Sequence, residues 1–205
     1  MLYPSTRGVK TLGDRPEMNE GWFPLSFMQR IFWFLDQFEP NTPAYNLPRA
    51  LKITGELDIS ALREAFRALL RRHDVLRTGF FSSLEGEPFQ CVLDDVDISL
   101  TIRDISSLRA FKHELETATI AFEEARKIFD LERPPLLRLT LLRLGPGEHM
   151  LILVMHHIIT DGWSMSILFK ELSQSYFKEL SQSYERLAAG QEPCARSKGD
   201  GRLTQ

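Results

Sequence analysis

The clearest periodic pattern along the chain runs over residues 58–73. Apolar residues recur there with the 3.6-residue period of a helix that buries one face, namely Leu62, Ala65, Phe66, Leu69 and Leu70. Asp58 stands where a carboxylate caps a helix, and Arg71, Arg72 and His73 are cations that suit the carboxyl end. The pattern predicts an amphipathic helix packed on a core.

The other apolar runs predict three more helices and six strands. Helices are expected over residues 25–38, 107–128 and from Trp163 onward, and the aromatic-rich first one is predicted to be short and buried. Strands are expected over residues 50–54, 77–82, 88–93, 98–103, 137–144 and 149–155. Gly145 and Gly147 predict a turn that joins the last two strands as an antiparallel hairpin. Because residues 150–155 are apolar throughout, the final strand is predicted to be central and buried on both faces.

An eight-residue segment is repeated within the last predicted helix. The sequence of residues 169–176 returns unchanged over residues 177–184. This unit is too short for a solenoid, and a tandem duplication explains it more simply. Eight residues add about 12 Å of helix and turn the following face by about 80°, so one flat surface cannot bury both copies.

The duplication therefore predicts an overlong helix whose second copy projects from the body. We expect Leu180 and Tyr184 to be much more exposed than Leu168 and Leu172. The alternative is a helix break within residues 173–183 that restores the register. Residues 1–21 and 191–205 are polar and rich in turn residues, and we expect a flexible leader and a disordered tail.

Composition narrows the function classes but does not indicate any chemistry. The chain has 205 residues, 43% of them hydrophobic, and a net charge of −3, which gives no reason to expect nucleic-acid binding. Cys91 and Cys194 suggest neither a disulfide framework nor a metal site. No run approaches the roughly 18 apolar residues of a membrane span. We therefore expect a cytoplasmic protein that binds neither membrane nor nucleic acid.

The strongest candidate for chemistry is the segment 155–164, at the predicted junction of the buried strand and the last helix. Neighbouring strand residues point to opposite faces, so we expect His157, and not His156, to face a cleft. An imidazole there could accept a proton at neutral pH, and Gly162 would let backbone N–H groups approach an oxyanion. Each residue also has a structural interpretation: a core histidine, Asp161 as a helix N-cap, and Gly162 as turn geometry.

The whole constellation resembles the condensation domains of non-ribosomal peptide synthetases, within the chloramphenicol acetyltransferase-like superfamily. Residues 156–164 read His-His-Ile-Ile-Thr-Asp-Gly-Trp-Ser, similar to the family's signature His-His-x-x-x-Asp-Gly. Residues 72–80 resemble the second family motif, and residues 25–35 followed by 43–46 resemble the first. The likeness covers residues 22–190, with the motifs in the family's order.

Three departures from the family pattern stand out. Asp74 occupies a position where Glu is usual, and Ile31, preceded by Arg30, occupies one where Arg is usual. The eight-residue duplication is foreign to the pattern. Full-length members continue into a second lobe, so we expect residues 22–190 to form the amino-terminal lobe without its carboxyl-terminal counterpart, and to be inactive by themselves.

The resemblance implies an α/β fold of the α+β sandwich kind, with a mixed, largely antiparallel sheet and helices packed on it. It implies amide-bond formation between carrier-bound aminoacyl or peptidyl thioesters, with His157 as the catalytic histidine and Gly162 beside it. His156 and Asp161 are implied to be structural. We expect the Asp161 carboxylate to lie within hydrogen-bonding reach of Arg72, Arg77 or the helix N–H groups after Trp163.

The same resemblance implies the partners and leaves alternatives open. The expected partners are peptidyl carrier proteins, the second lobe and adjacent synthetase modules. Because the substrates arrive on the phosphopantetheine of carrier proteins, the domain is expected to bind no cofactor or metal itself. The alternatives are an acyl-CoA-dependent acyltransferase of the same superfamily and a non-catalytic fragment that acts at most as a docking surface.

Overall fold

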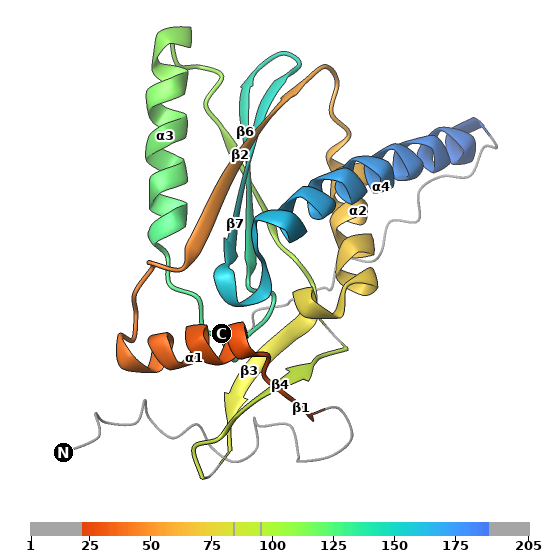
Figure 1. The fold of residues 1–205 in the computed structure, drawn as a ribbon. Helices are drawn as coiled ribbons and strands as arrows, with labels where there is room; N and C mark the ends of the chain where they lie inside the picture. The colour runs from red at the N-terminus through yellow and green to blue at the C-terminus, as the bar shows by residue number, and fades with distance from the viewer. Residues whose placement is uncertain (1–21, 84, 95, 189–205) are drawn as a thin grey trace, which may run out of the picture.

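A computed structural model describes residues 22–83, 85–94 and 96–188 (Figure 1). The predicted leader and tail, residues 1–21 and 191–205, lie outside the described residues. The strands form two sheets, one in the order β2-β7-β6-β5 and a smaller one in the order β1-β4-β3.

The elements follow one another with these bounds: β1 Trp22–Pro24, α1 Phe27–Phe38, β2 Asn46–Thr54, α2 Ile59–Arg72, η2 Asp74–Arg77, β3 Thr78–Ser82, β4 Pro88–Val92, β5 Leu100–Asp104, α3 Ala110–Arg126, β6 Leu137–Gly145, β7 Glu148–His156, η3 His157–Ile159 and α4 Gly162–Ala188. Every helix and strand expected from the pattern is present, with bounds shifted by a few residues.

The larger sheet is built around β7, as the apolar run predicts. β7 lies between β2 and β6, and residues 151–156 are all buried. β6 and β7 form the expected antiparallel hairpin, and Gly147 at its turn has a φ of 67°, a left-handed conformation that suits glycine. Of the strand pairs in the described residues, β5 with β6 is parallel and the others are antiparallel, so the mixed, largely antiparallel prediction is confirmed.

β2 begins four residues earlier than the pattern predicts, and Pro48 is the reason. A proline donates no ladder hydrogen bond, so it argues against a strand in the sequence. β2 is an edge strand of its sheet, where Pro48 is tolerated opposite Val154 of β7.

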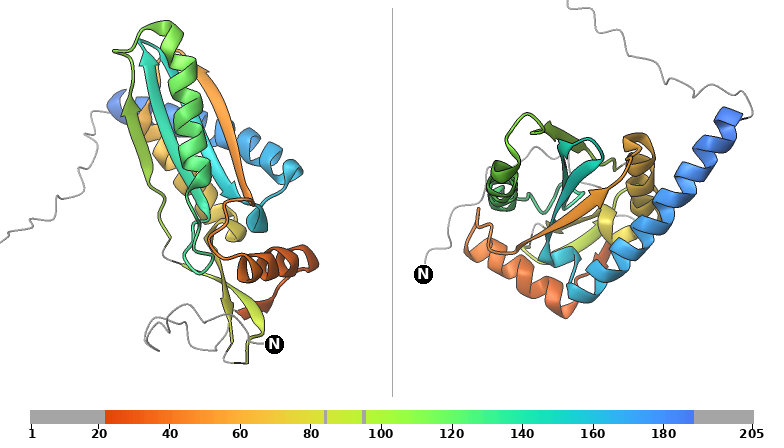
Figure 2. Two further views of the ribbon diagram at one scale, coloured as in Figure 1. Left: turned by 90° about the vertical axis from the view of Figure 1, so that its left-hand side faces the viewer. Right: turned by 90° about the horizontal axis from the view of Figure 1, so that it is seen from above.

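Helices cover both faces of the larger sheet (Figure 2). α3 lies on one face, and α2 and α4 lie on the other, where they contact each other. The predicted cap of α2 is confirmed, because Asp58 Oδ1 accepts the N–H groups of Ser60 (2.8 Å) and Ala61 (3.0 Å). The five apolar residues that predicted this helix are all buried.

The prediction that α1 is buried is wrong. The helix has a capping box between Ser26 and Gln29, but most of its large side chains face outward, and Phe27 is 78% exposed. α1 lies at the end of the larger sheet and contacts η3, so only one side is covered. Phe32 and Trp33 are its partly buried apolar residues packed against the core.

α4 runs without a break through both copies of the repeat, and its far end extends beyond α2 (Figures 1 and 2). Leu168 (6% exposed) and Leu172 (4% exposed) are buried, whereas Leu180 is partly exposed, as the overlong helix predicts. The hydroxyl of Tyr176, at the end of the first copy, accepts the N–H of Asp58 (3.1 Å). The side chain of Tyr184 lies outside the described residues.

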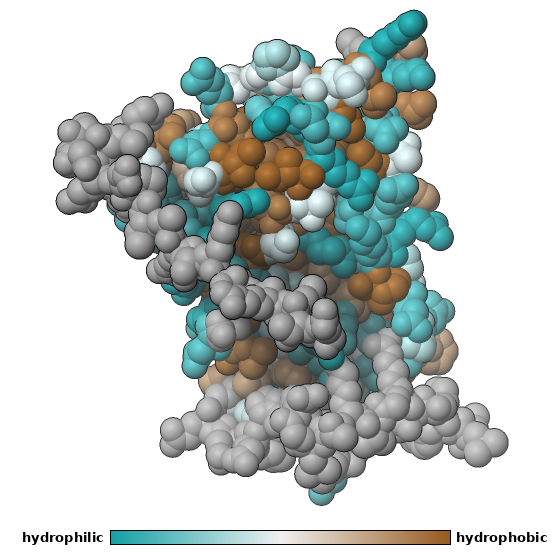
Figure 3. Space-filling view, turned by 180° about the vertical axis from the view of Figure 1, so that it is seen from behind, coloured by the Kyte–Doolittle hydropathy of each residue, from teal (hydrophilic) through white to brown (hydrophobic). Residues whose placement is uncertain are grey.

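Exposed apolar residues are not confined to one place on the molecule. The view from behind shows hydrophobic residues among hydrophilic ones on that face as well (Figure 3). Ile102 of β5, for example, is 40% exposed. Single exposed apolar side chains are ordinary for a protein surface, so exposure alone does not mark a site.

Candidate active site

The two histidines lie at the junction between β7 and α4, where the backbone is fixed on both sides. The His156 N–H donates to the carbonyl of Leu136 (3.0 Å), just before β6, and the His157 N–H donates to the carbonyl of Tyr45 (2.8 Å), just before β2. One 3-10 turn, η3, then connects the strand to the helix. The junction is thus held by hydrogen bonds to the segments that lead into both neighbouring strands.

His156 belongs to the core. It is 3% exposed, and its ring meets those of Phe129 and Tyr45 edge-on, at centroid distances of 6.1 and 6.2 Å. Its Nδ1 accepts the N–H of Ile158 (3.2 Å), which shapes the η3 turn. Burial, together with the nearby charges of His157 and Arg138, lowers the pKa of His156 to about 4. The ring is therefore neutral at physiological pH, as a hydrogen-bond acceptor at Nδ1 must be.

This buried histidine should make the protein less stable in mild acid. A histidine in the unfolded chain has a pKa of 6.5, so between that pH and about 4 the unfolded state binds a proton that His156 does not. The free energy of unfolding should fall by about 2 kcal/mol between about pH 7.5 and about pH 5. Urea denaturation at a series of pH values measures this slope.

The matched control for the pH slope is His156→Asn, which keeps an acceptor for the Ile158 N–H but does not titrate. Most of the slope should disappear in this variant. Burial also lowers the pKa of His149, which leaves a smaller slope of the same sign. An unchanged slope in His156→Asn would show that His156 is not the group responsible.

His157 differs from its neighbour in burial and in contacts. It is half-buried, and its ring stacks on that of Phe32 from α1, with centroids 4.5 Å apart and planes 23° apart. Its Nδ1 is enclosed and has no hydrogen-bond partner among the described residues. The accessible part of the ring is therefore not Nδ1. The burial of the two residues agrees with the expectation that His157, rather than His156, is open to a cleft.

Asp161 caps the helix that follows. Its Oδ1 accepts the N–H of Ser164 (2.7 Å), and its carbonyl accepts the N–H of Met165 (3.0 Å). The hydrogen bonds from Ser164 hold the pKa of the Asp161 carboxyl below its ordinary value. Gly162 is the exposed first residue of α4, and a Cβ built on it meets nothing within 4 Å. Neither packing nor a positive φ demands a glycine here, and the space beside its backbone is open.

Of the partners expected for Asp161, the helix N–H groups are the ones present, and in the described part of the chain neither Arg72 nor Arg77 pairs with it. Arg77 donates to the carbonyls of Leu70 (2.9 Å) and Leu93 (2.8 Å), and to Asp74. These bonds tie the end of α2 to the end of β4. Arg72 lies 3.7 Å from Glu171 of α4. Asp161 is instead satisfied by helix N–H groups, which stabilise a carboxylate without a cation.

Phe32 and Tyr45 are the contacts of the site that residue-by-residue reasoning missed. Phe32 packs on His157 and Tyr45 holds its backbone, yet they precede it by more than a hundred residues. The first-motif resemblance was the available signal, because it covered residues 25–35 and 43–46, but it assigned neither residue a contact.

A comparison with protein-family models matches residues 19–193 to the condensation domain. The chain therefore belongs to the condensation-domain family. Among curated relatives, a linear gramicidin synthase of Brevibacillus parabrevis is 39% identical over 83% of this chain. Phosphinothricin tripeptide synthetase PhsC of Streptomyces viridochromogenes is 40% identical over 78% of it. The chain spans only 2% and 14% of the lengths of these two proteins.

Solved condensation domains share the fold. The first condensation domain of the calcium-dependent antibiotic synthetase, in complex with a substrate analogue, matches 87% of this chain with a TM-score of 0.69 and 26% identity. The starter condensation domain of rhizomide synthetase RzmA matches 87% of it with a TM-score of 0.66 and 22% identity. The matched regions make up 41% and 42% of those two chains.

The described residues contain neither a membrane-spanning helix nor a metal site. No helix in that part of the chain is long and apolar enough to cross a membrane. No group of three or more His, Cys, Asp or Glu side chains is arranged there to hold a metal ion.

Proposed function

We propose that this chain is the amino-terminal lobe of a condensation domain that joins two carrier-bound aminoacyl or peptidyl thioesters through an amide bond. The observation that carries the proposal is the junction of β7 and α4. It presents a half-buried histidine, His157, one 3-10 turn before a helix N-terminus whose first residue, Gly162, has an open side.

The chemistry assigned to this junction is acyl transfer from sulfur to nitrogen. The acceptor's α-amine attacks the donor carbonyl, a C–N bond forms, and the tetrahedral intermediate collapses with loss of the C–S bond. His157 takes the proton of the attacking amine, or positions the amine, and the proton ends on the departing thiolate. The backbone N–H of Gly162 and the positive end of the α4 dipole favour negative charge on the carbonyl oxygen, whereas the N–H of Ser164 is already bound by Asp161.

The neighbouring groups keep this arrangement in place. His156 is buried and neutral, and it fixes the η3 turn through the N–H of Ile158. Phe32 holds the ring of His157 by stacking, and Asp161 caps α4. In this role they are positioning residues, because none of them needs to touch a substrate.

The proposal includes the partners and the absence of a cofactor bound by the lobe. Both substrates arrive on the phosphopantetheine arms of carrier proteins in the cytoplasm, and the lobe contributes side chains and backbone only. The named relatives are peptide synthetases, which supports condensation over acyl-CoA-dependent acyl transfer.

Grafting tests the proposal. Residues 22–188 replace the matching lobe in the linear gramicidin synthase to which the chain is similar, and dipeptide formation is measured with donor- and acceptor-loaded carrier proteins. The grafted domain should form dipeptide, and His157→Ala should lower the rate at least about 100-fold. His113→Ala, in α3 and outside the junction, is the control and should retain most of the rate. An active graft that does not depend on His157 would refute the assignment.

A further inference from the structure

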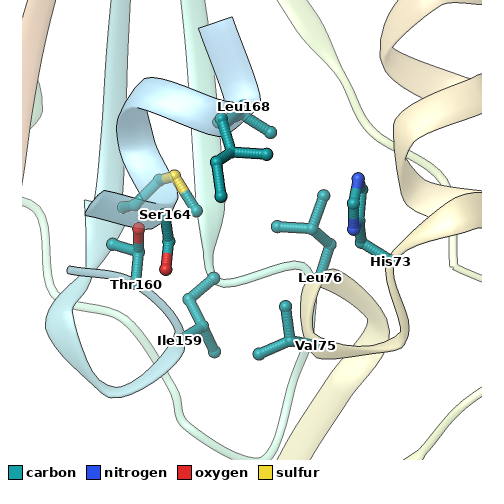
Figure 4. A pocket seen from close by; sticks show the side chains of 9 residues that line it. His73, Val75, Leu76, Ile159, Thr160, Ser164 and Leu168 are labelled. Atoms are coloured by element: carbon teal, nitrogen blue, oxygen red, sulfur yellow. The ribbon is translucent and has the colours of Figure 1, made fainter. Parts of the chain in front are cut away.

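A second feature of the molecule lies beside the junction. A pocket of about 260 Å³ opens between η2 and the first turns of α4, and Ile159 and Thr160, two and three residues after His157, form part of its wall (Figure 4). The short segment 157–160 therefore carries the candidate catalytic histidine and also forms part of the cavity wall. None of the chemistry assigned to His157 uses this cavity.

The walls of the pocket are mostly apolar and come from both sides. Leu76 of η2 faces Ile159 and Leu168 across the cavity (Figure 4). Val75 and Ile167, which also line it, are 39% and 41% exposed. The pocket is thus lined by buried side chains inside and by partly exposed ones at its rim, so a group can enter from solvent.

The polar side chains in the wall already have partners. His73 Nε2 lies 2.6 Å from Glu171 Oε2. The Thr160 hydroxyl donates to the carbonyl of Asp161 (3.4 Å), and the Ser164 hydroxyl is hydrogen-bonded to the carboxylate of the same residue. An occupant would therefore find little unmet hydrogen-bonding capacity. A charged occupant would lose its hydration without compensation, which is costly.

The contact between His73 and Glu171 also sets the shape of the pocket. His73 ends α2 and Glu171 lies in the third turn of α4, so the contact joins the two helices that flank the cavity. Arg72 approaches the same carboxylate at 3.7 Å. The pocket wall on this side is therefore held by an interaction between elements about a hundred residues apart in sequence.

We propose that this pocket is a specificity subsite for an uncharged, apolar side chain of the size of leucine or phenylalanine, carried by one of the two residues that are joined. The identification of the occupant as an amino-acid side chain rests on the proposed function. An apolar cavity of about 150 Å³ is large enough to bind benzene, so a cavity of about 260 Å³ has room for a side chain of the size of leucine or phenylalanine. The apolar wall favours an aliphatic or small aromatic group over a polar one.

The test uses the full chain and three soluble probes: the α-amides of N-acetyl-leucine, N-acetyl-glycine and N-acetyl-glutamate. Binding is followed by NMR through the methyl resonances of Ile159, Ile167 and Leu168. The leucine probe should shift these resonances and bind at least about tenfold more tightly than the glycine probe. The glutamate probe, with its side-chain charge, should not shift them.

Two variants locate the binding. Ile167→Trp fills the mouth of the pocket and should abolish the shifts that the leucine probe causes at Ile159 and Leu168. Ile102→Trp, at a residue of matching exposure (40% against 41%) on β5, should preserve them. Both are surface substitutions, and their amide spectra show directly whether the fold is intact. The subsite proposal would be contradicted if the leucine and glycine probes bound equally tightly. It would also be contradicted if both variants lost the leucine-induced shifts to the same extent.

The outcome separates this inference from the proposed function, because the measurement needs no turnover. If the leucine probe binds at these methyl groups but the graft is inactive, the results support an apolar binding pocket and contradict the condensation proposal. An active graft whose lobe shows no shift with the leucine probe would remove the subsite alone.

Discussion

Incubated with donor- and acceptor-loaded carrier proteins, the 205-residue chain by itself should form no detectable dipeptide. The solved domains that it matches contain more than twice its matched length, and this lobe supplies one half-buried histidine at an open junction. Holding two reactants in the attack geometry accounts for about 7–11 kcal/mol of a barrier. A surface that contacts the substrates from one side cannot supply most of that effect.

The control for this experiment is the grafted domain, assayed with the same carrier proteins. Activity in the graft and none in the isolated chain would locate the requirement in the second lobe rather than in the assay. Dipeptide formation by the isolated chain that is lost in His157→Ala would contradict the expectation, because the first lobe would then suffice.

The duplication in α4 allows a stability experiment with an internal control. Leu172→Ala should lower the free energy of unfolding by about 3 kcal/mol, because it removes a buried side chain that is 4% exposed. Leu180→Ala changes the same residue in the second copy, where the side chain is partly exposed, and should cost less than about 1 kcal/mol. Urea denaturation of both variants measures the difference.

The comparison is well matched, because Leu172 and Leu180 have identical flanking residues in the two copies. The effect of the substitution on helix propensity therefore cancels, and the difference reports tertiary packing. Equal losses in the two variants would show that the second copy is packed as well as the first. A larger loss at Leu180 would show that the second copy, and not the first, occupies the contact with α2.

The sequence by itself determined the helices and strands that bury either one face or their whole surface in the core. The 3.6-residue period over residues 58–73 and the unbroken apolar run of residues 150–155 each correspond to one packing environment, so they predicted α2 and the central strand β7 correctly. The junction of strand and helix at residues 155–164 followed from the same local patterns. The placement of Asp161 as an N-cap is also local, since its hydrogen-bond donors lie within four residues.

Only the tertiary structure decided what lies across from these elements. Aromatic residues in α1 predicted a buried helix, but how much of a helix is covered depends on its neighbours, and α1 has contacts on one side only. That Arg72 and Arg77 do not pair with Asp161 has the same cause, because carbonyls at the ends of α2 and β4 compete for Arg77 and their positions depend on the fold. The stacking of Phe32 on His157 and the contact of His73 with Glu171 join segments about a hundred residues apart. Periodicity shows which face of a helix or strand is apolar, but chain topology determines which element packs against that face. The same topology brings together the residues of the candidate active site and of the adjacent pocket.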